Sequence, residues 1–123
     1  MPEHISAEKC FQLLKNDNNC HLIDVRMPIE LESYGYPKIE GINKNLHFIT
    51  WSHADGTLNE NFLNQLRELN LKNDAKLFFM CKSGVRSQYA GTHVKEHLDN
   101  VEVYSVEGGF ELGWKSSKLP IKY

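Results

Sequence analysis

The sequence predicts an α/β domain with a mainly parallel β-sheet, and two observations lead to this prediction. Segments with apolar residues at helical spacing alternate along the chain with short apolar runs of strand length, at 21–25, 75–80 and 101–106. The run at 75–80 is the most apolar of the chain, and its length and the turn residues after it predict a central parallel strand. Because parallel sheets bind ligands at the carboxyl ends of their strands, a site is expected after residue 80.

Four helices are predicted from the spacing of apolar residues. The first begins after Ser6, which is a suitable N-cap, and the next two cover 59–69 and 87–98. A short fourth helix follows a turn at the glycine pair 108–109. The residues expected to face the core are Ala7, Cys10, Phe11 and Leu14, then Phe62, Leu63, Leu66 and Leu69, then Ala90, Val94 and Leu98, and finally Trp114.

The remaining segments carry weaker patterns. Residues 26–41 have the Pro and Gly punctuation of a long loop, and a further short strand is placed at 41–46. The chain shows no internal repeat, no low-complexity segment and no linker rich in Pro, Gly or Ser. We therefore expect one domain over residues 1–123.

The composition excludes several classes of protein. With 41% hydrophobic and 24% charged residues, the chain has the composition of a globular protein rather than a disordered or membrane protein. A formal net charge of -2 gives no general attraction to nucleic acid or anionic lipid, so neither is expected as a partner. The N-terminus shows no signal-peptide pattern and no apolar run has the length of a membrane span, so a cytoplasmic location is expected.

The cysteines and histidines do not form a metal or disulfide pattern. The three cysteines are an odd number without CxxC spacing, so at least one thiol stays free. Cys10 and Cys20 have the sequence context of buried core residues. His93 and His97 stand four residues apart on a predicted helix, but no cysteine or carboxylate accompanies them at ligand spacing. We expect no metal and no cofactor.

Cys81 has a setting that the other two thiols lack. It follows the apolar run at 75–80 directly, and the sequence CKSGVRS leads from it into the next predicted helix. Gly84 allows a tight turn that aims the loop amides inward, and these amides, Lys82 and Arg86 favour negative charge on the sulfur. Since the thiolate is the nucleophilic form of cysteine, Cys81 is the predicted catalytic residue.

The rest of this loop is predicted to bind an anion or the substrate. Arg86 either contacts the substrate or braces the loop against a carboxylate. Ser83 and Ser87 can donate hydrogen bonds to a sulfur atom, although a serine at a helix start also acts as a cap. The predicted binding loop comprises Lys82, Ser83, Gly84, Val85, Arg86 and Ser87.

Several motifs, taken together, resemble the single-domain rhodaneses, a family of sulfurtransferases. LIDVR at 22–26, Glu30, IEGI at 39–42, CKSGVRS at 81–87 and VYSVEGGFELGW at 103–114 occur in that order over nearly the whole chain. The resemblance implies a mainly parallel five-stranded sheet flanked by helices on both faces. Within these motifs we interpret Asp24, Arg26 and Glu30 as structural support, because carboxylates and guanidinium groups at strand ends pin loops by paired hydrogen bonds.

The resemblance also implies a reaction. Cys81 would take a sulfane sulfur from a donor such as thiosulfate or a persulfide, carry it as a persulfide, and yield it to a thiol or cyanide. The partners implied are small molecules, with a sulfur-relay protein as an alternative.

Two other functions remain open at the level of sequence. Cysteine phosphatases and arsenate reductases use a related loop, but they place more residues between Cys and Arg than the four found here, Lys82 to Val85. Because a tighter ring suits one sulfur atom better than a phosphoryl group, we treat this function as the lesser alternative. The third reading is a rhodanese-like carrier or interaction module. Such modules commonly lack the cysteine, whereas this chain has both Cys81 and Arg86.

Overall fold

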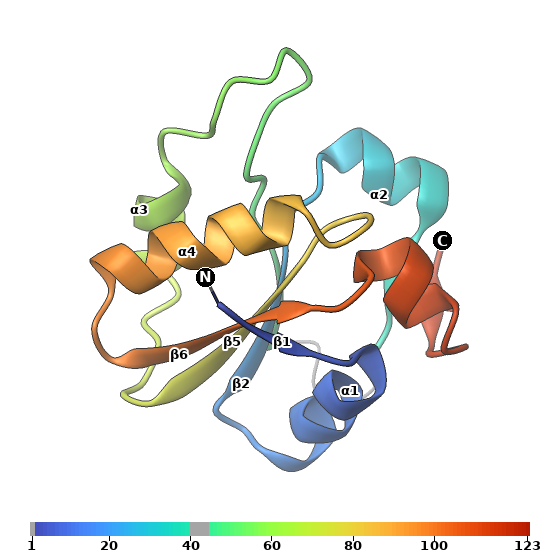
Figure 1. Ribbon diagram of the computed structural model, residues 1–123, viewed down its shortest axis with the longest axis horizontal. Coiled ribbons are helices and arrows are strands. Elements are labelled where there is room, and N and C mark those ends of the chain that lie inside the picture. Colours follow the sequence, from blue (N-terminus) through green and yellow to red (C-terminus); the bar gives the residue numbers. More distant parts are fainter. Residues whose placement is uncertain (1, 40–44) are drawn as a thin grey trace.

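A five-stranded parallel sheet forms the centre of the computed structural model, which describes residues 2–39 and 45–123 (Figure 1). The strand order is β1-β6-β5-β2-β4, and every neighbouring pair is parallel. The strands are β1 (Glu3–Ile5), β2 (Cys20–Asp24), β4 (Leu46–Phe48), β5 (Ala75–Met80) and β6 (Val101–Val106). A second, antiparallel pair joins β3 (Tyr36–Pro37) to β7 (Ile121–Lys122). The predicted mainly parallel five-stranded sheet is confirmed.

Helices cover both faces of this sheet. α3 (Phe62–Arg67) and α4 (Arg86–His97) pack on one face, and α1 (Ala7–Asn16) packs on the other with η2 (Gly109–Lys115), a π-helical segment. α2 (Pro28–Tyr34) lies beside the end of the sheet at which β5 leads into its loop (Figure 1). The predicted placement of helices on both faces is therefore confirmed.

β5 lies at the centre of the packing. Leu77 and Phe79 join the apolar cluster under α3 and α4, whereas Phe78 and Met80 join the cluster under α1 and η2. All four side chains are fully buried. Because both faces of the strand are covered, its sequence is continuously apolar instead of alternating.

The helices predicted from apolar spacing are present. α1 starts after Ser6, whose hydroxyl accepts a hydrogen bond from the Lys9 amide at 3.2 Å. The indole Nε1 of Trp114 donates to the carbonyl of Pro120 at 2.8 Å, which satisfies its polar atom inside the core.

None of the helices in the described part of the chain combines the length and apolarity that a membrane span requires. The predicted core residues that are buried are Ala7, Cys10, Leu14, Cys20, Phe62, Leu66, Ala90, Val94 and Trp114.

The prediction of a continuous loop over 26–41 is wrong, because α2 occupies part of this segment. Pro28 stands at the start of the helix, where a backbone N–H would lack an intrahelical partner and the fixed φ of proline fits. The Met27 amide donates to Oε1 of Glu30 at 3.0 Å, which closes the first turn. Gly35 then ends the helix with a φ of 84°. Pro28 and Gly35 therefore mark the boundaries of a helix.

Short strands account for the other differences. The strand predicted at 41–46 falls mainly on residues 41–44, which lie outside the described residues, and β4 begins at Leu46 beside β2. β1, β3 and β7 have two or three residues each and are not predicted from the sequence. Segments of this length are too short to display a period of alternation.

Truncation of Leu77 tests how much β5 contributes to stability. Leu77→Ala removes buried methyl groups and leaves a cavity, so we expect the free energy of unfolding to fall by about 2–5 kcal/mol. Leu58 is 55% exposed and provides a control, because Leu58→Ala should change this free energy by less than about 0.5 kcal/mol. Urea unfolding followed by circular dichroism measures both variants. Equal losses would contradict the packing of β5 described above.

Candidate active site

Cys81 lies at the carboxyl end of β5, in the loop that leads into α4 (Figure 1). Its side chain is almost fully buried, with 1% of its surface exposed. The Gly84 amide donates to Sγ at 3.1 Å, and Sγ lies 3.5 Å from the hydroxyl of Ser87. The sulfur is therefore held inside the loop by a backbone donor and a hydroxyl group.

Gly84 has a backbone conformation that residues with a side chain rarely adopt. Its φ is +102°, and a Cβ at this position would lie 3.3 Å from the backbone nitrogen of Gly108. A larger residue would meet both a torsional and a steric penalty here. The turn at Gly84 is what brings its amide to the sulfur of Cys81.

Further amides of the loop are left unpaired, among them the two on either side of Gly84. The amides of Ser83 and Val85 meet no acceptor among the residues that the structure describes. Val85 is also the N-cap of α4, where the helix dipole favours negative charge. These groups can donate to an anionic substrate or to a second sulfur atom bound to Sγ.

Arg86 braces the loop against α2. Its two terminal nitrogens donate to the two carboxylate oxygens of Glu30, each at 2.7 Å, although the residues are 56 positions apart in sequence. Burial by itself would raise the pKa of Glu30, but the hydrogen bonds from Arg86 and from the Met27 amide bring it below its ordinary value. The sequence leaves open whether Arg86 contacts the substrate or braces the loop against a carboxylate, and in the structure it braces the loop against Glu30.

Lys82 also has a partner within the protein. Its Nζ lies 4.5 Å from the centroid of the Tyr34 ring and 3.4 Å from the Tyr34 hydroxyl. A cation over an aromatic ring is attracted by the negative face of the ring. Both cations of the predicted binding loop therefore contact α2, whereas the sulfur of Cys81 accepts a hydrogen bond from the backbone amide of Gly84.

A buried ion pair stands behind the loop. Arg26 donates to both oxygens of Asp24, with the shortest contact at 2.7 Å, and both side chains are fully buried. The same guanidinium donates to the carbonyl of Gly35 and lies 4.1 Å from the centroid of the Phe110 ring. Burial raises the pKa of Asp24, and the hydrogen bonds from Arg26 oppose this rise. Arg26 thus connects the end of β2 to α2 and η2.

The backbone of η2 closes the loop from the other side. The Phe110 amide donates to the carbonyl of Cys81 at 2.7 Å, and the Glu111 amide donates to the carbonyl of Lys82 at 3.0 Å. Gly109 has a φ of +61°, and a Cβ on it would lie 2.8 Å from the Lys82 oxygen and closer still to the Cys81 oxygen. The sequence predicts Gly109 only as part of a turn. In the structure it is the position at which the backbone of η2 contacts the backbone of Cys81 and Lys82.

Ser105 is a buried hydroxyl group that the sequence does not single out. It lies on β6, and its Oγ is 2.7 Å from Oγ of Ser87. When the sulfur of Cys81 is negatively charged, Ser87 can donate to it and Ser105 can donate to Ser87. The only signal in the sequence is a serine near the end of an apolar strand. Ser87 itself lies within α4, after the N-cap at Val85, so it is not a helix cap.

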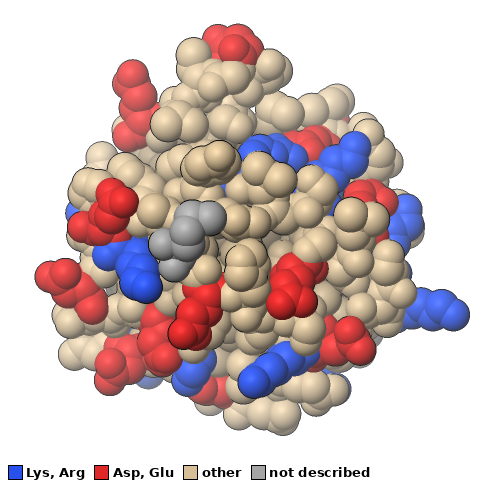
Figure 2. All heavy atoms as spheres, in the orientation of Figure 1, with Lys and Arg blue, Asp and Glu red and all other residues tan. Residues whose placement is uncertain are grey.

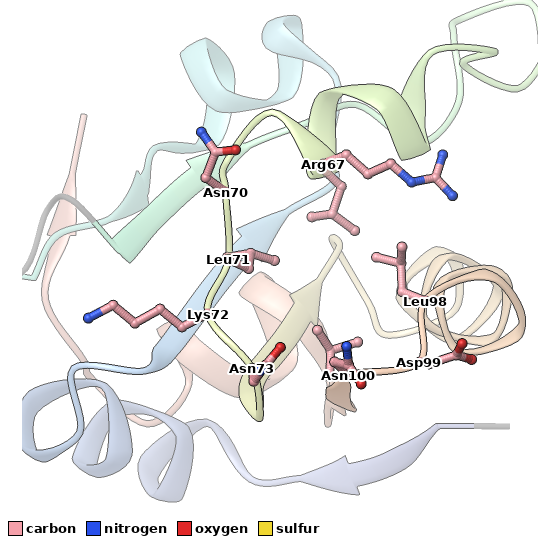
Figure 3. A pocket seen from close by; sticks show the side chains of 10 residues that line it. Arg67, Asn70, Leu71, Lys72, Asn73, Leu98, Asp99 and Asn100 are labelled. Carbon is pink, nitrogen blue, oxygen red and sulfur yellow. The ribbon is translucent and has the colours of Figure 1, made fainter.

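Among the described residues, no three His, Cys, Asp or Glu side chains lie close enough together to hold a metal ion. A cavity of about 330 Å³ lies at the amino ends of β5 and β6 (Figure 3), opposite the edge that carries Cys81. It is not part of the candidate active site. The residues labelled around it are Arg67, Asn70, Leu71, Lys72, Asn73, Leu98, Asp99 and Asn100.

The chain belongs to the rhodanese-like domain family. The family model of the rhodanese-like domain matches residues 7–117. An uncharacterized protein of Rickettsia rickettsii is 32% identical over 127 residues, which cover 98% of this chain and 98% of the relative. The resemblance seen in the sequence motifs is confirmed at the level of the family.

Solved structures with the same fold come from proteins with different descriptions. Rv0390 from M. tuberculosis has a TM-score of 0.85 and 27% identity, and the match covers 98% of this chain and 96% of that one. The polysulfide-sulfur transferase homodimer of Wolinella succinogenes has a TM-score of 0.73 and 24% identity, over 98% and 78% of the chains. A Rhodopseudomonas palustris protein described as a possible tyrosine phosphatase has a TM-score of 0.68 and 21% identity, over 98% and 85%. The last two show the fold alone.

The brace between Arg86 and Glu30 predicts a pH dependence of stability. The pKa of Glu30 is lower in the folded protein than its ordinary value, so the pair stabilises the fold above that ordinary value. The stabilisation is lost as the pH falls through the folded-state pKa. Glu30→Gln keeps an acceptor for the Met27 amide and should lower the free energy of unfolding by about 1 kcal/mol near neutral pH.

Urea unfolding of wild type and Glu30→Gln at neutral pH and at about pH 3 measures this difference. We expect the two proteins to differ at neutral pH and to converge in acid. A difference that stays constant over this range would contradict the charged brace.

The hydroxyl chain predicts an effect on the reactivity of Cys81. Ser105→Ala leaves Ser87 with the sulfur as its only polar side-chain partner among the described residues and removes one donor from the chain. The loss of one hydrogen bond should slow alkylation of Cys81 by iodoacetamide about three- to tenfold. Ser33→Ala, at an exposed position, serves as the control. Peptide mass spectrometry measures the rate at Cys81, and an unchanged rate in Ser105→Ala would exclude this role.

Proposed function

We propose that this protein is a sulfurtransferase that carries a sulfane sulfur as a persulfide on Cys81. The observation that carries the proposal is the Gly84 amide at 3.1 Å from Sγ, in a loop with further unpaired amides. Membership of the rhodanese-like family supports it, as does the fold shared with a polysulfide-sulfur transferase. The donor is thiosulfate or a persulfide, and the acceptor is a thiol or cyanide.

The first half-reaction loads the enzyme. The Cys81 thiolate attacks the outer sulfur of the donor, so a new S–S bond forms to Sγ while the bond between that sulfur and the rest of the donor breaks. The electron pair of the broken bond leaves with sulfite when the donor is thiosulfate, and with a thiolate when the donor is a persulfide. Because the donor supplies an already oxidised sulfur, no external oxidant is required.

The second half-reaction releases the sulfur. An acceptor thiolate or cyanide attacks the outer sulfur of the persulfide, and the S–S bond to Cys81 breaks to regenerate the thiolate. The product is an acceptor persulfide or thiocyanate. In both steps negative charge develops on a sulfur inside the loop, where the amides of Ser83, Gly84 and Val85 can donate to it.

The loop supports sulfur transfer better than phosphoryl transfer. Four residues separate Cys81 from Arg86, and Arg86 already donates to both oxygens of Glu30. A phosphoryl group presents three equatorial oxygens that need donors in the transition state, which a tight loop with an engaged arginine supplies poorly. A single sulfur atom needs less space and fewer donors.

Mass spectrometry of the purified protein tests the proposed function. After treatment with thiosulfate or polysulfide, the Cys81 peptide should gain one sulfur atom that cyanide removes. Cys81→Ser should show no gain at that position, whereas Cys20→Ala should behave like wild type because Cys20 is fully buried in the core.

Three results would contradict the proposal. The first is the absence of any cyanide-removable sulfur on Cys81. The second is hydrolysis of an aryl phosphate that depends on Cys81, which would favour a phosphatase. The third is a Cys81→Ser protein that keeps its cellular function, which would favour an interaction module.

A further inference from the structure

The cavity at the amino ends of β5 and β6 lies between two loops that are fixed to each other. The Asp74 amide, in the loop after α3, donates to the carbonyl of Asn100, in the loop after α4, at 2.8 Å. The carbonyl of Asn73 accepts a further hydrogen bond from Nδ2 of Asn19 at 3.0 Å. The walls of the cavity are therefore held in place by the fold, as in most small-molecule sites, which are largely formed before the ligand binds.

The floor of the cavity is apolar. Leu66 is fully buried, and Leu71, Leu98 and Val101 are partly buried and pack against the apolar cluster under α3 and α4. Figure 3 shows the side chains of Leu71 and Leu98 pointing toward each other from the two loops. A ligand with an apolar body that enters between them removes apolar surface from water, which favours binding.

Arg67, the last residue of α3, supplies a positive charge at the rim of the cavity. Its side chain extends toward the segment that carries Leu98, whereas the side chains of Lys72 and Asp99 point away from the cavity (Figure 3). The guanidinium of Arg67 makes no hydrogen bond or ion pair with any residue that the structure describes. An arginine without a partner can bind a carboxylate through two parallel hydrogen bonds, a geometry that lysine does not offer.

The rest of the surface does not supply a general attraction for anions. The chain has a formal net charge of -2, and Figure 2 shows acidic and basic side chains interspersed on the visible face. A preference for an anion at the cavity therefore has to come from Arg67 itself. The side-chain amides of Asn73 and Asn100, which also line the cavity and have no partner among the described residues, can both donate and accept hydrogen bonds there.

We propose that this cavity binds a small organic molecule with one carboxylate, whose apolar body lies between Leu71 and Leu98 and whose carboxylate lies on Arg67. The volume of about 330 Å³ falls at the lower end of the range for ligand pockets, roughly 300–1,000 Å³. It equals the space of about eleven water molecules, which corresponds to a ligand of roughly that many heavy atoms. The site is independent of the sulfur-transfer function, since Cys81 lies at the opposite end of β5.

Three probes with the same phenylpropyl body test the proposal. Phenylpropanoate is the anion, phenylpropanol the neutral compound and phenylpropylammonium the cation. Titration of the isotope-labelled full-length protein, followed by NMR, measures the Kd of each probe and locates it on the chain. We expect the backbone shifts to gather at 66–73 and 98–101, with a Kd of about 1 mM or lower for phenylpropanoate.

The charge of the probe should set the order of affinity. Phenylpropanoate should bind about three- to fivefold more tightly than phenylpropanol, because an ion pair at an exposed rim contributes a factor of this size. Phenylpropylammonium should bind more weakly than phenylpropanol, since its charge has the same sign as that of Arg67.

Three variants test the roles of individual side chains. Arg67→Gln should remove the preference for phenylpropanoate over phenylpropanol. Lys72→Gln also removes one positive charge, but from a side chain that points away from the cavity, so this matched control should keep the preference. Asn100→Trp places a large side chain at an exposed position on the lining and should weaken all three probes at least about tenfold by filling the cavity. The hydrogen bond from Asp74 to Asn100 uses the backbone carbonyl and is retained in this variant.

Four results would overturn the proposal. One is the absence of saturable shifts at 66–73 and 98–101 up to about 10 mM phenylpropanoate. Another is a set of shifts confined to 81–87, which would assign the binding to the candidate active site. Equal affinities of wild type for the three probes would exclude a role of the carboxylate. Equal losses in Arg67→Gln and Lys72→Gln would show that the net charge of the protein, and not Arg67, selects the anion.

Discussion

Two backbone hydrogen bonds, from the Phe110 and Glu111 amides to the carbonyls of Cys81 and Lys82, hold the loop on which the candidate site depends. A tight loop at a strand end leaves polar backbone groups without partners, and buried groups of this kind are costly. With the carbonyls satisfied by η2, the loop can turn its amides toward Sγ. The contact requires Gly109, because a side chain there would collide with the Cys81 carbonyl.

The buried ion pair of Asp24 and Arg26 connects β2, α2 and η2, the segments around the loop. Removing two charges from water costs several kcal/mol each, so such a pair adds little net stability. Its value is geometric, because the guanidinium reaches Asp24 on β2, the Gly35 carbonyl after α2 and the ring of Phe110 at once. Phe110 contacts Arg26 through its ring and donates through its amide to the carbonyl of Cys81, so one residue links the ion pair to the loop.

The parts of this molecule that the sequence predicts are those determined locally. The continuous apolar run of β5 and the 3.6-residue spacing in α1, α3 and α4 are local patterns, and so is the CKSGVRS loop. The sequence does not predict α2, because proline is common both in loops and at helix starts. What marks Pro28 as a helix start is the hydrogen bond from the Met27 amide to Glu30, which only the structure shows. The link of Glu30 to Arg86 spans 56 residues, so only the folded chain brings the two together.

The charge distribution around Cys81 follows from these contacts and separates two sources of positive potential. In the sequence, Lys82 and Arg86 are the predicted partners of an anion, since both follow the thiol within five residues. In the fold both side chains contact α2, and the group that donates a hydrogen bond to Sγ is the backbone amide of Gly84. Dipoles at hydrogen-bond distance stabilise partial charge on one sulfur atom well, but their potential falls off faster with distance than that of a full cation. The amide of Gly84 therefore acts on the charge of the sulfur itself, whereas the charge of Arg86 fixes the position of the loop against α2.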